Sequence, residues 1–350
     1  MILIFGVVNQ YGVLSHFSEG IKHDLETMGE TCLVLPVDDG VTAAKLLNQI
    51  SKKDVKFSLC INGSGLDTAL TFGKAYALAV DHPLLILPHL QQYKGFELLC
   101  VAKEHTAFAQ LLNIPARDFF HAVSRADIAS AGSLNEAKSG EILFPASHIN
   151  KDNAQKKLQE MGVWDQLKPV VTAVGSINEL LMAIGVLPNG NQPARAQLNE
   201  AIYKITCEAD LYIRALARER ILASYTEKNI VLDVYGRNVK QYQQAYPFHR
   251  YHDEVPYKDM LEKMANASFV VHNSPGFEFA LHERMVYPLA KGTPILFDAN
   301  VNQRQMLQGL PAVYPSNKVQ TDVPLEHRKS TVNEIEKNHT WAARLAALLN

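Results

Sequence analysis

The stretch from Phe269 to Asp298 constrains the fold most, because it contains a complete strand–helix–strand pattern. Its first and last apolar runs, FVV and PILF, are typical of buried parallel strands, and apolar residues recur between them at helical spacing. Proline is tolerated only in the first turn of a helix, so Pro288 places the start of this helix near Arg284 or Met285. The sequence therefore predicts a βαβ unit.

Polar residues gather at the turn before this predicted helix. His282, Glu283 and Arg284 fall at its N-terminus, and Asn273 and Ser274 follow the preceding strand. Free backbone N–H groups and the helix dipole favour an anion there, and open parallel sheets bind ligands at this edge. Arginine suits a diphosphate because its planar fork donates two charge-assisted hydrogen bonds. The turn therefore predicts a phosphate site, and the alternative is a surface arginine paired with a neighbouring glutamate.

The first 135 residues show the same alternation of strands and helices. Apolar runs typical of strands cover residues 2–8, 31–35, 57–61, 84–87, 98–102 and 119–123, and helical spacing covers residues 17–28, 71–80 and 106–112. This rhythm indicates a doubly wound parallel sheet. Residues 130–140 are rich in alanine, serine, glycine and charge, which is typical of a linker. We therefore expect a Rossmann-like domain over residues 1–135.

Residues 136–330 are interpreted as a second Rossmann-like domain with a helical insertion. A strand over residues 141–145 precedes the helical segment 151–228, in which a long helix runs from Ala194 to about Tyr225. A strand over residues 230–235 and a helix over residues 259–267 lead into the βαβ unit. The capping-box spacing of Thr331 and Glu334 predicts a last helix over residues 331–350. The predicted fold class is α/β, with two doubly wound domains.

Composition and motifs argue against several classes of function. With 34 basic and 36 acidic side chains, the net charge of -2 gives no field for nucleic acid or anionic lipid. The start, MILIFGVV, lacks a basic leader, and no apolar run is long enough to span a bilayer. The four cysteines lack CxxC spacing, which fits a reducing cytoplasm. We expect a cytoplasmic protein that is not transmembrane and has no nucleic-acid partner.

The sequence also lacks the motifs of common cofactor and metal sites. Its 13 histidines include no HExxH or HxH pair, so metal ligation has no support in the sequence. The first turn lacks GxGxxG, and there is no GxxxxGK[ST] run typical of an ATP-cleaving site. We therefore expect neither a cofactor nor a metal ion.

The run HER followed by LAKGTPILFD resembles the C-terminal signature of CgeB-like glycosyltransferases, relatives of two-domain GT-B-fold enzymes that use nucleotide sugars. In that pattern an arginine precedes the helix and a small-x-Gly step precedes the next strand, as Arg284 and Gly292 do here. The run His339-Thr340-Trp341 followed by Arg344 is similar to the closing motif of the family.

Further motifs extend this resemblance over residues 230–349. Tyr235-Gly236 and Val255-Pro256-Tyr257 are similar to segments upstream of the HER run. In the N-terminal half, Val80-Asp81-His82-Pro83 is similar to an Asp-x-Pro loop of related enzymes.

The resemblance implies a glycosyltransferase whose two Rossmann-like domains face a cleft. Because helix N–H groups and Arg284 would stabilise the leaving diphosphate, we expect no metal ion to be required. The resemblance also implies that the first domain presents an acceptor hydroxyl, that the second holds a nucleotide-diphosphate sugar, and that the last helix packs near the domain junction. The donor-binding candidates are Ser147, Gly236, Tyr257, Asn273, Ser274, His282, Glu283 and Arg284.

One departure from the family pattern concerns the donor ribose. Many such enzymes have a glutamate five residues before the glycine of the small-x-Gly step, held to bind the ribose, and this chain has Tyr287. Either Glu283 or Glu278 takes over from a neighbouring turn, or the ribose is held differently.

Three candidate residues outside the HER run each have an alternative explanation. Ser147 follows the strand at 142–145 and could bind a phosphate oxygen, but an N-cap for a helix near Lys151 explains it nearly as well. Asp81 could be the base that deprotonates the acceptor, although a turn aspartate before Pro83 is the common alternative. Its predicted position before a strand also argues against it, since α/β sites usually follow strands. His16 is the competing base, unless it is only a solvated helix-start histidine.

Two other classes of function stay open at this point. A non-catalytic protein that binds a sugar or nucleotide is favoured by Tyr287, because the expected glutamate is missing. A nucleotide-sugar epimerase of related fold would interconvert sugars without an acceptor.

Overall fold

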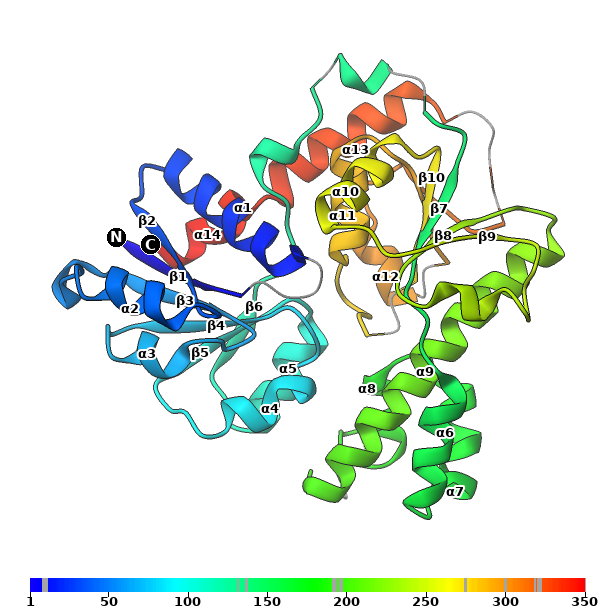
Figure 1. The fold of residues 1–350 in the computed structure, drawn as a ribbon, viewed down its shortest axis with the longest axis horizontal. Coiled ribbons are helices and arrows are strands. Elements are labelled where there is room, and N and C mark those ends of the chain that lie inside the picture. The colour runs from blue at the N-terminus through cyan, green and yellow to red at the C-terminus, as the bar shows by residue number, and fades with distance from the viewer. Residues whose placement is uncertain are drawn as a thin grey trace. The chain divides into compact units, whose positions relative to one another are not determined.

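The structure is a computed structural model, and it describes residues 1–7, 12–130, 132–135, 138–190, 194, 198–273, 276–298, 301–317, 319 and 323–349. Its first sheet has six parallel strands in the order β2-β1-β3-β4-β5-β6 (Figure 1). The strands are β1 (Ile2–Gly6), β2 (Cys32–Pro36), β3 (Phe57–Ile61), β4 (Ala75–Ala79), β5 (Phe96–Cys100) and β6 (Ala116–Asp118). The helices between them are α1 (Val13–Thr27), α2 (Gly40–Leu47), α3 (Leu66–Leu70), α4 (Pro83–Leu90) and α5 (Lys103–Leu111).

The core of this sheet explains why its strands form. β1, β3 and β4 are buried along their whole length, as expected for parallel strands covered by helices on both faces. Leu3, Phe5, Cys60, Ala77 and Leu98 belong to one apolar cluster that joins four neighbouring strands. The doubly wound first sheet is therefore confirmed.

Three predicted elements of this half are wrong. Residues 75–79 form strand β4 rather than a helix, and residues 84–87 lie in helix α4 rather than a strand. Alanine and leucine favour helix locally, but β3 and β5 pair with β4 on both sides and decide its conformation. The predicted strand at 119–123 is also displaced, since β6 ends at Asp118.

The second sheet has the strand order β12-β11-β10-β7-β8-β9. Its strands are β7 (Ile142–Pro145), β8 (Asp233–Tyr235), β9 (Arg250–His252), β10 (Phe269–Val271), β11 (Ile295–Leu296) and β12 (Val313–Tyr314). The helices are α6 (Lys151–Glu160), α7 (Trp164–Ala173), α8 (Ile177–Ala183), α9 (Glu200–Glu227), α10 (Tyr257–Asn266), α11 (Glu283–Ala290), α12 (Val301–Met306), α13 (Leu325–Asn338) and α14 (Trp341–Leu349).

The predicted βαβ unit is confirmed as β10, α11 and β11, and the insertion as helices α6 to α9. These four helices share a core that includes Leu158, Trp164, Val171 and Ile213, and they form the helical arm seen in Figure 1. The long helix α9 begins later than predicted, at Glu200, where the Asn199 side chain accepts a hydrogen bond from the Ile202 N–H (3.0 Å).

The single helix predicted for residues 331–349 is wrong, because the chain forms α13 and α14 instead. Thr340 makes a parallel β-bridge with Val123, and the His339 carbonyl accepts from the Val123 N–H (3.0 Å). These bonds take backbone groups that a continuous helix needs. Thr331 lies inside α13, where its hydroxyl accepts from the Ala312 N–H (3.1 Å) rather than capping a helix.

The chain groups into two compact units that do not follow the order of the sequence. Unit 1 contains Met1–Ser139, Pro256–Ala267 and Phe279–Asn350, and unit 2 contains Gly140–Val255 and Ser268–Glu278. The domain limits at residues 135 and 330 stay a prediction, as does a position of the last helix near a domain junction.

Candidate functional site

Unit 2 places three of the predicted donor residues at one edge of its sheet. Ser147, Gly236 and Asn273 follow the carboxyl ends of β7, β8 and β10, and β7 pairs in parallel with both of the other strands. The chain continues from β7 to β8 on one side and returns to β10 on the other. Ligands of open α/β sheets bind where the strand order reverses in this way.

Gly236 and Ser147 hold the loops after β7 and β8 together. The Arg237 N–H donates to Ser147 Oγ (3.1 Å), and the His148 N–H donates to the Arg237 carbonyl (2.8 Å). Gly236 has a φ of 154°, and a Cβ on it would lie 2.6 Å from the Ser147 nitrogen. Only glycine allows this approach. The N-cap interpretation of Ser147 is wrong, since Asn150 caps α6.

Helix α9 brings two arginines to the same loops, and the sequence analysis missed both. Arg218 donates to the Ser147 carbonyl, and a Cβ on Gly276 would lie 3.5 Å from an Arg214 guanidinium nitrogen. Arg214 also pairs with the buried carboxylate of Asp210 (2.8 Å). The spacing of four residues puts both arginines on one helix face, which was the signal available in the sequence.

Asn273 adds a buried donor to this edge. Among the residues that the structure describes, its Nδ2 atom is buried without a hydrogen-bond partner. A buried amide without a partner costs free energy, so the atom is suited to a ligand oxygen. Ser274, which was predicted beside it, lies outside the described residues.

Unit 1 contains the HER run at the N-terminus of α11. The Glu283 carboxylate lies 2.5 Å from His282 Nδ1 and 3.6 Å from Arg284 Nε. An Arg284 nitrogen lies 3.4 Å from His282 Nε2. His282 is the N-cap of α11, because its Nδ1 atom accepts a hydrogen bond from the Arg284 backbone N–H (3.2 Å). Arg284 therefore has a neighbouring glutamate, Glu283, as the alternative interpretation of a paired surface arginine requires. The Arg284 side chain is about a quarter exposed.

His121 lies on the buried side of this run and was not predicted. Its Nε2 atom lies 3.8 Å from Glu283 Oε2, and its ring centroid lies 5.5 Å from that of His282. Burial lowers the pKa of His121 to about 4, against the opposing attraction of Glu283. The imidazole is therefore neutral at neutral pH.

His16 lies one turn inside α1 and pairs with a carboxylate that the sequence did not reveal. Its Nε2 atom is 3.2 Å from Asp127 Oδ2. Its ring packs edge-on against Tyr257 (5.5 Å between centroids) and Tyr287 (6.0 Å). Burial raises the pKa of both phenols, so they stay neutral beside the pair. A carboxylate that orients an imidazole in this way is suited to general-base chemistry.

Asp81 lies in a different place from the one predicted. It follows strand β4 and precedes helix α4, whose N-cap is His82 and whose first residue is Pro83. The topological objection to Asp81 is therefore wrong, because the residue is at the carboxyl end of a parallel strand. The preceding Val80 N–H donates to Asn62 Oδ1 (3.0 Å), which fixes the start of this loop.

The sequence analysis named Glu283 and Glu278 as possible replacements for the ribose-binding glutamate that is missing at Tyr287. Glu283 is engaged by His282 and Arg284, whereas Glu278 in unit 2 hydrogen-bonds the Ser176 hydroxyl. Burial raises the pKa of Glu278. Tyr287 is buried on α11, with the Lys291 ammonium 5.6 Å from its ring centroid.

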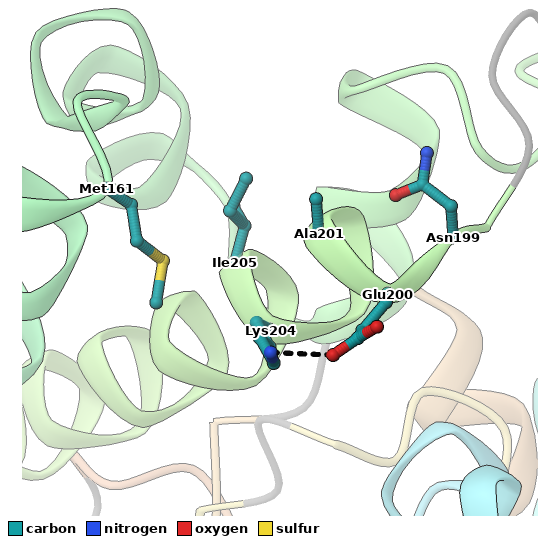
Figure 2. Close-up of a pocket in the computed structure, with 6 residues that line it drawn as sticks. All are labelled: Met161, Asn199, Glu200, Ala201, Lys204 and Ile205. Carbon is teal, nitrogen blue, oxygen red and sulfur yellow. Dashed lines mark hydrogen bonds and ion pairs between the residues drawn. The ribbon is translucent and has the colours of Figure 1, made fainter.

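The helical arm carries a separate hollow of about 650 Å³ near the start of α9 (Figure 2). It is lined by Met161, Asn199, Glu200, Ala201, Lys204 and Ile205, and a Lys204–Glu200 ion pair (2.7 Å) lies along it. It contains none of the predicted site residues. Across the described part of the chain, no three His, Cys, Asp or Glu side chains group closely enough to hold a metal ion. No described helix is long and apolar enough to cross a membrane.

Two parallel six-stranded sheets with flanking helices are the fold of GT-B glycosyltransferases. The chain is similar over 99% of its length to the DNA modifying enzyme beta-glucosyltransferase, with 98% of that chain covered, 10% identity and a TM-score of 0.50. It is also similar to AviGT4, a glycosyltransferase involved in avilamycin A biosynthesis, with 99% and 95% of the two chains covered, 11% identity and a TM-score of 0.51. Neither the models of protein families nor the curated proteins match the chain.

Proposed function

We propose that the protein is a glycosyltransferase that moves a sugar from a nucleoside diphosphate to an acceptor hydroxyl. The observation that carries the proposal is the meeting of Arg214 and Arg218 with the loops after β7 and β10, where the strand order reverses. The GT-B fold supports it, and the similar beta-glucosyltransferase has uridine diphosphoglucose as its substrate. A CgeB-like specificity is the finer part of the proposal, based on the HER run and the closing motif.

In the proposed reaction, the loops after β7 and β10 bind the donor diphosphate, and a side chain of this protein acts as the base. Arg218 and Arg214 donate to the diphosphate oxygens, with Ser147 and the Asn273 amide beside them. Arg284 is a further proposed phosphate-binding residue, as the resemblance of the HER run implies. The acceptor oxygen attacks the anomeric carbon, the bond to the phosphate oxygen breaks, and the nucleoside diphosphate leaves with the electron pair. Fixed guanidinium charges stabilise that leaving group, so we propose that no metal ion is needed.

The proposed base is His16, held by Asp127, with Asp81 as the competing candidate. Asp127 keeps one imidazole nitrogen protonated, so the other nitrogen is free to take the proton of the acceptor hydroxyl. We propose a cytoplasmic protein whose acceptor is not nucleic acid, because the net charge of -2 offers no attraction to a polyanion.

Calorimetric titration with UDP and with uridine tests the donor site. We expect Arg218→Ala and Arg284→Ala each to weaken UDP binding by about tenfold to a hundredfold and to leave uridine binding unchanged, since a charged hydrogen bond contributes about 1.5–3 kcal/mol. Arg220→Ala is the matched control, because this arginine is on the same helix but donates to the Thr172 carbonyl (2.8 Å). Equal losses for UDP and uridine in both variants would contradict the donor site.

A non-catalytic nucleotide-binding protein is the second candidate, and the buried Tyr287 at the position of the expected glutamate favours it. Prolonged incubation with UDP-glucose separates the two functions. A transferase hydrolyses its donor slowly when no acceptor is present, whereas a pure binder leaves the sugar nucleotide intact. Interconversion of the sugar without release of UDP would instead indicate an epimerase.

A further inference from the structure

The residues His121, His282, Glu283 and Arg284 form one contiguous group in unit 1, which we call the Glu283 cluster. We infer that His121 is a positioning residue for Arg284: it fixes the Glu283 carboxylate that orients the guanidinium. The inference rests on the proposed role of Arg284 in binding the donor diphosphate. His121 belongs to the segment after β6 and lies 162 positions before Glu283 in sequence, so the coupling exists only in the folded chain.

The geometry of Glu283 leaves it little freedom to rotate. One carboxylate oxygen, Oε2, has His282 Nδ1 at 2.5 Å and His121 Nε2 at 3.8 Å, and the other oxygen faces Arg284 Nε at 3.6 Å. The glutamate side chain is only 15% exposed. His121 occupies the buried side of the cluster, with a side-chain exposure of 1%. Without it, the carboxylate could turn inward and away from Arg284.

The charge of His121 matters as much as its shape. A protonated imidazole at this position would compete with Arg284 for the single negative charge of Glu283. Burial keeps His121 neutral, as its lowered pKa of about 4 indicates. The neutral ring is therefore a polar neighbour of Glu283 that does not compete with Arg284 for the negative charge of the carboxylate.

Two further contacts hold the His121 ring itself. The backbone of Val80 lies close enough to the ring to oppose the lowering of its pKa. Phe17 on α1 packs against the ring at 5.9 Å between centroids. Val80 precedes Asp81, and Phe17 follows His16. His121 thus joins the α11 N-terminus to both segments that carry a candidate base.

A double-mutant cycle with UDP and uridine tests this role. We expect His121→Phe to weaken UDP binding about tenfold, with uridine binding unchanged and the melting temperature showing a folded protein. In the Arg284→Ala background, the same change should have no further effect on UDP. His121→Gln, which keeps a neutral polar side chain beside Glu283, should restore most of the affinity. If the phenylalanine variant does not fold, His121→Asn takes its place in the cycle.

His105→Phe is the control, because His105 is equally buried in unit 1 but packs against His82 (4.6 Å between ring centroids). It should leave the UDP-to-uridine ratio unchanged. The same loss of UDP affinity from His121→Phe in both backgrounds would overturn the inference.

A second measurement separates this inference from the proposed function. The Arg284 Nε–H signal in ¹H–¹⁵N spectra needs no ligand, and we expect it to shift in His121→Phe and not in His105→Phe. An unaffected UDP affinity in Arg284→Ala contradicts the proposed donor role alone, and an unmoved Nε–H signal contradicts the positioning by His121.

Discussion

At the scale of single residues, the structure adds evidence on the two candidate bases, His16 and Asp81, between which the sequence did not decide. His16 has a partner carboxylate in Asp127, 3.2 Å from its Nε2 atom. Asp81 has the position expected of a site residue, because it follows a parallel strand. Position therefore no longer distinguishes the two, and the orienting partner favours His16.

Turnover measurements on three variants distinguish these bases. We expect His16→Ala to lower kcat by roughly 10²–10⁴-fold with donor affinity unchanged, because a general base acts only on the acceptor proton. Asp127→Asn should lower kcat by a smaller factor, since it removes only the charge that orients the imidazole. The control is His23→Ala, a half-exposed histidine further along α1. A collapse of kcat in Asp81→Asn with normal turnover in His16→Ala would transfer the role to Asp81.

At the scale of elements, a buried carboxylate attaches the last helix to the first. Asp24 on α1 is fully buried. It accepts hydrogen bonds from Ser124 Oγ (2.8 Å), the Arg125 N–H (2.9 Å) and the Ala342 N–H (2.9 Å) at the start of α14. Trp341 packs beside it against Phe17, at 5.7 Å between ring centroids. The closing motif that resembles the CgeB-like family therefore has a structural role in this chain.

Asp24→Asn should destabilise the protein, because an amide cannot accept all three of these hydrogen bonds and leaves a buried donor unpaired. We expect a loss in the free energy of unfolding of about 1.5–3 kcal/mol for each charge-assisted bond that is lost, measured by urea denaturation. Asp39→Asn provides the comparison, since this aspartate is an exposed cap of α2 and its loss should matter less. Similar losses in both variants would contradict the attachment of α14 through Asp24.

At the scale of the whole molecule, two buried histidines link stability to pH. Burial lowers the pKa of both His121 and His339 from 6.5 to about 4, and Arg344 adds to the effect at His339. The folded-state pKa lies below the unfolded value, so the unfolded chain binds more protons between these two pH values. Stability should therefore fall as the pH decreases from about 6.5 towards about 4.

Urea denaturation across this pH range measures the effect. Each extra proton on the unfolded chain contributes a slope of about 1.4 kcal/mol per pH unit. The double variant His121→Gln/His339→Gln should show a flatter dependence between pH values of about 4 and 6.5. An unchanged slope in the double variant would show that other groups control acid sensitivity.

The sequence by itself determined the elements whose signals are local. The runs at β3, β7 and β10 predicted the strands nearly as observed, because side-chain periodicity acts within a few residues. Helix α11 begins at Glu283, close to the predicted start, but Pro288 lies inside the helix rather than in its first turn. The same local signals placed Ser147, Gly236 and Asn273 in loops that follow strands, which the structure brings to one sheet edge.

Only the tertiary structure decided the features that depend on residues distant in sequence. Residues 75–79 became a strand because β3 and β5 pair with them, although alanine and leucine favour helix locally. Arg218 reaches Ser147 across 71 positions, and His16 meets Asp127 through the packing of α1. No periodicity in a single sequence carries these contacts, because chain packing rather than spacing along the chain creates them.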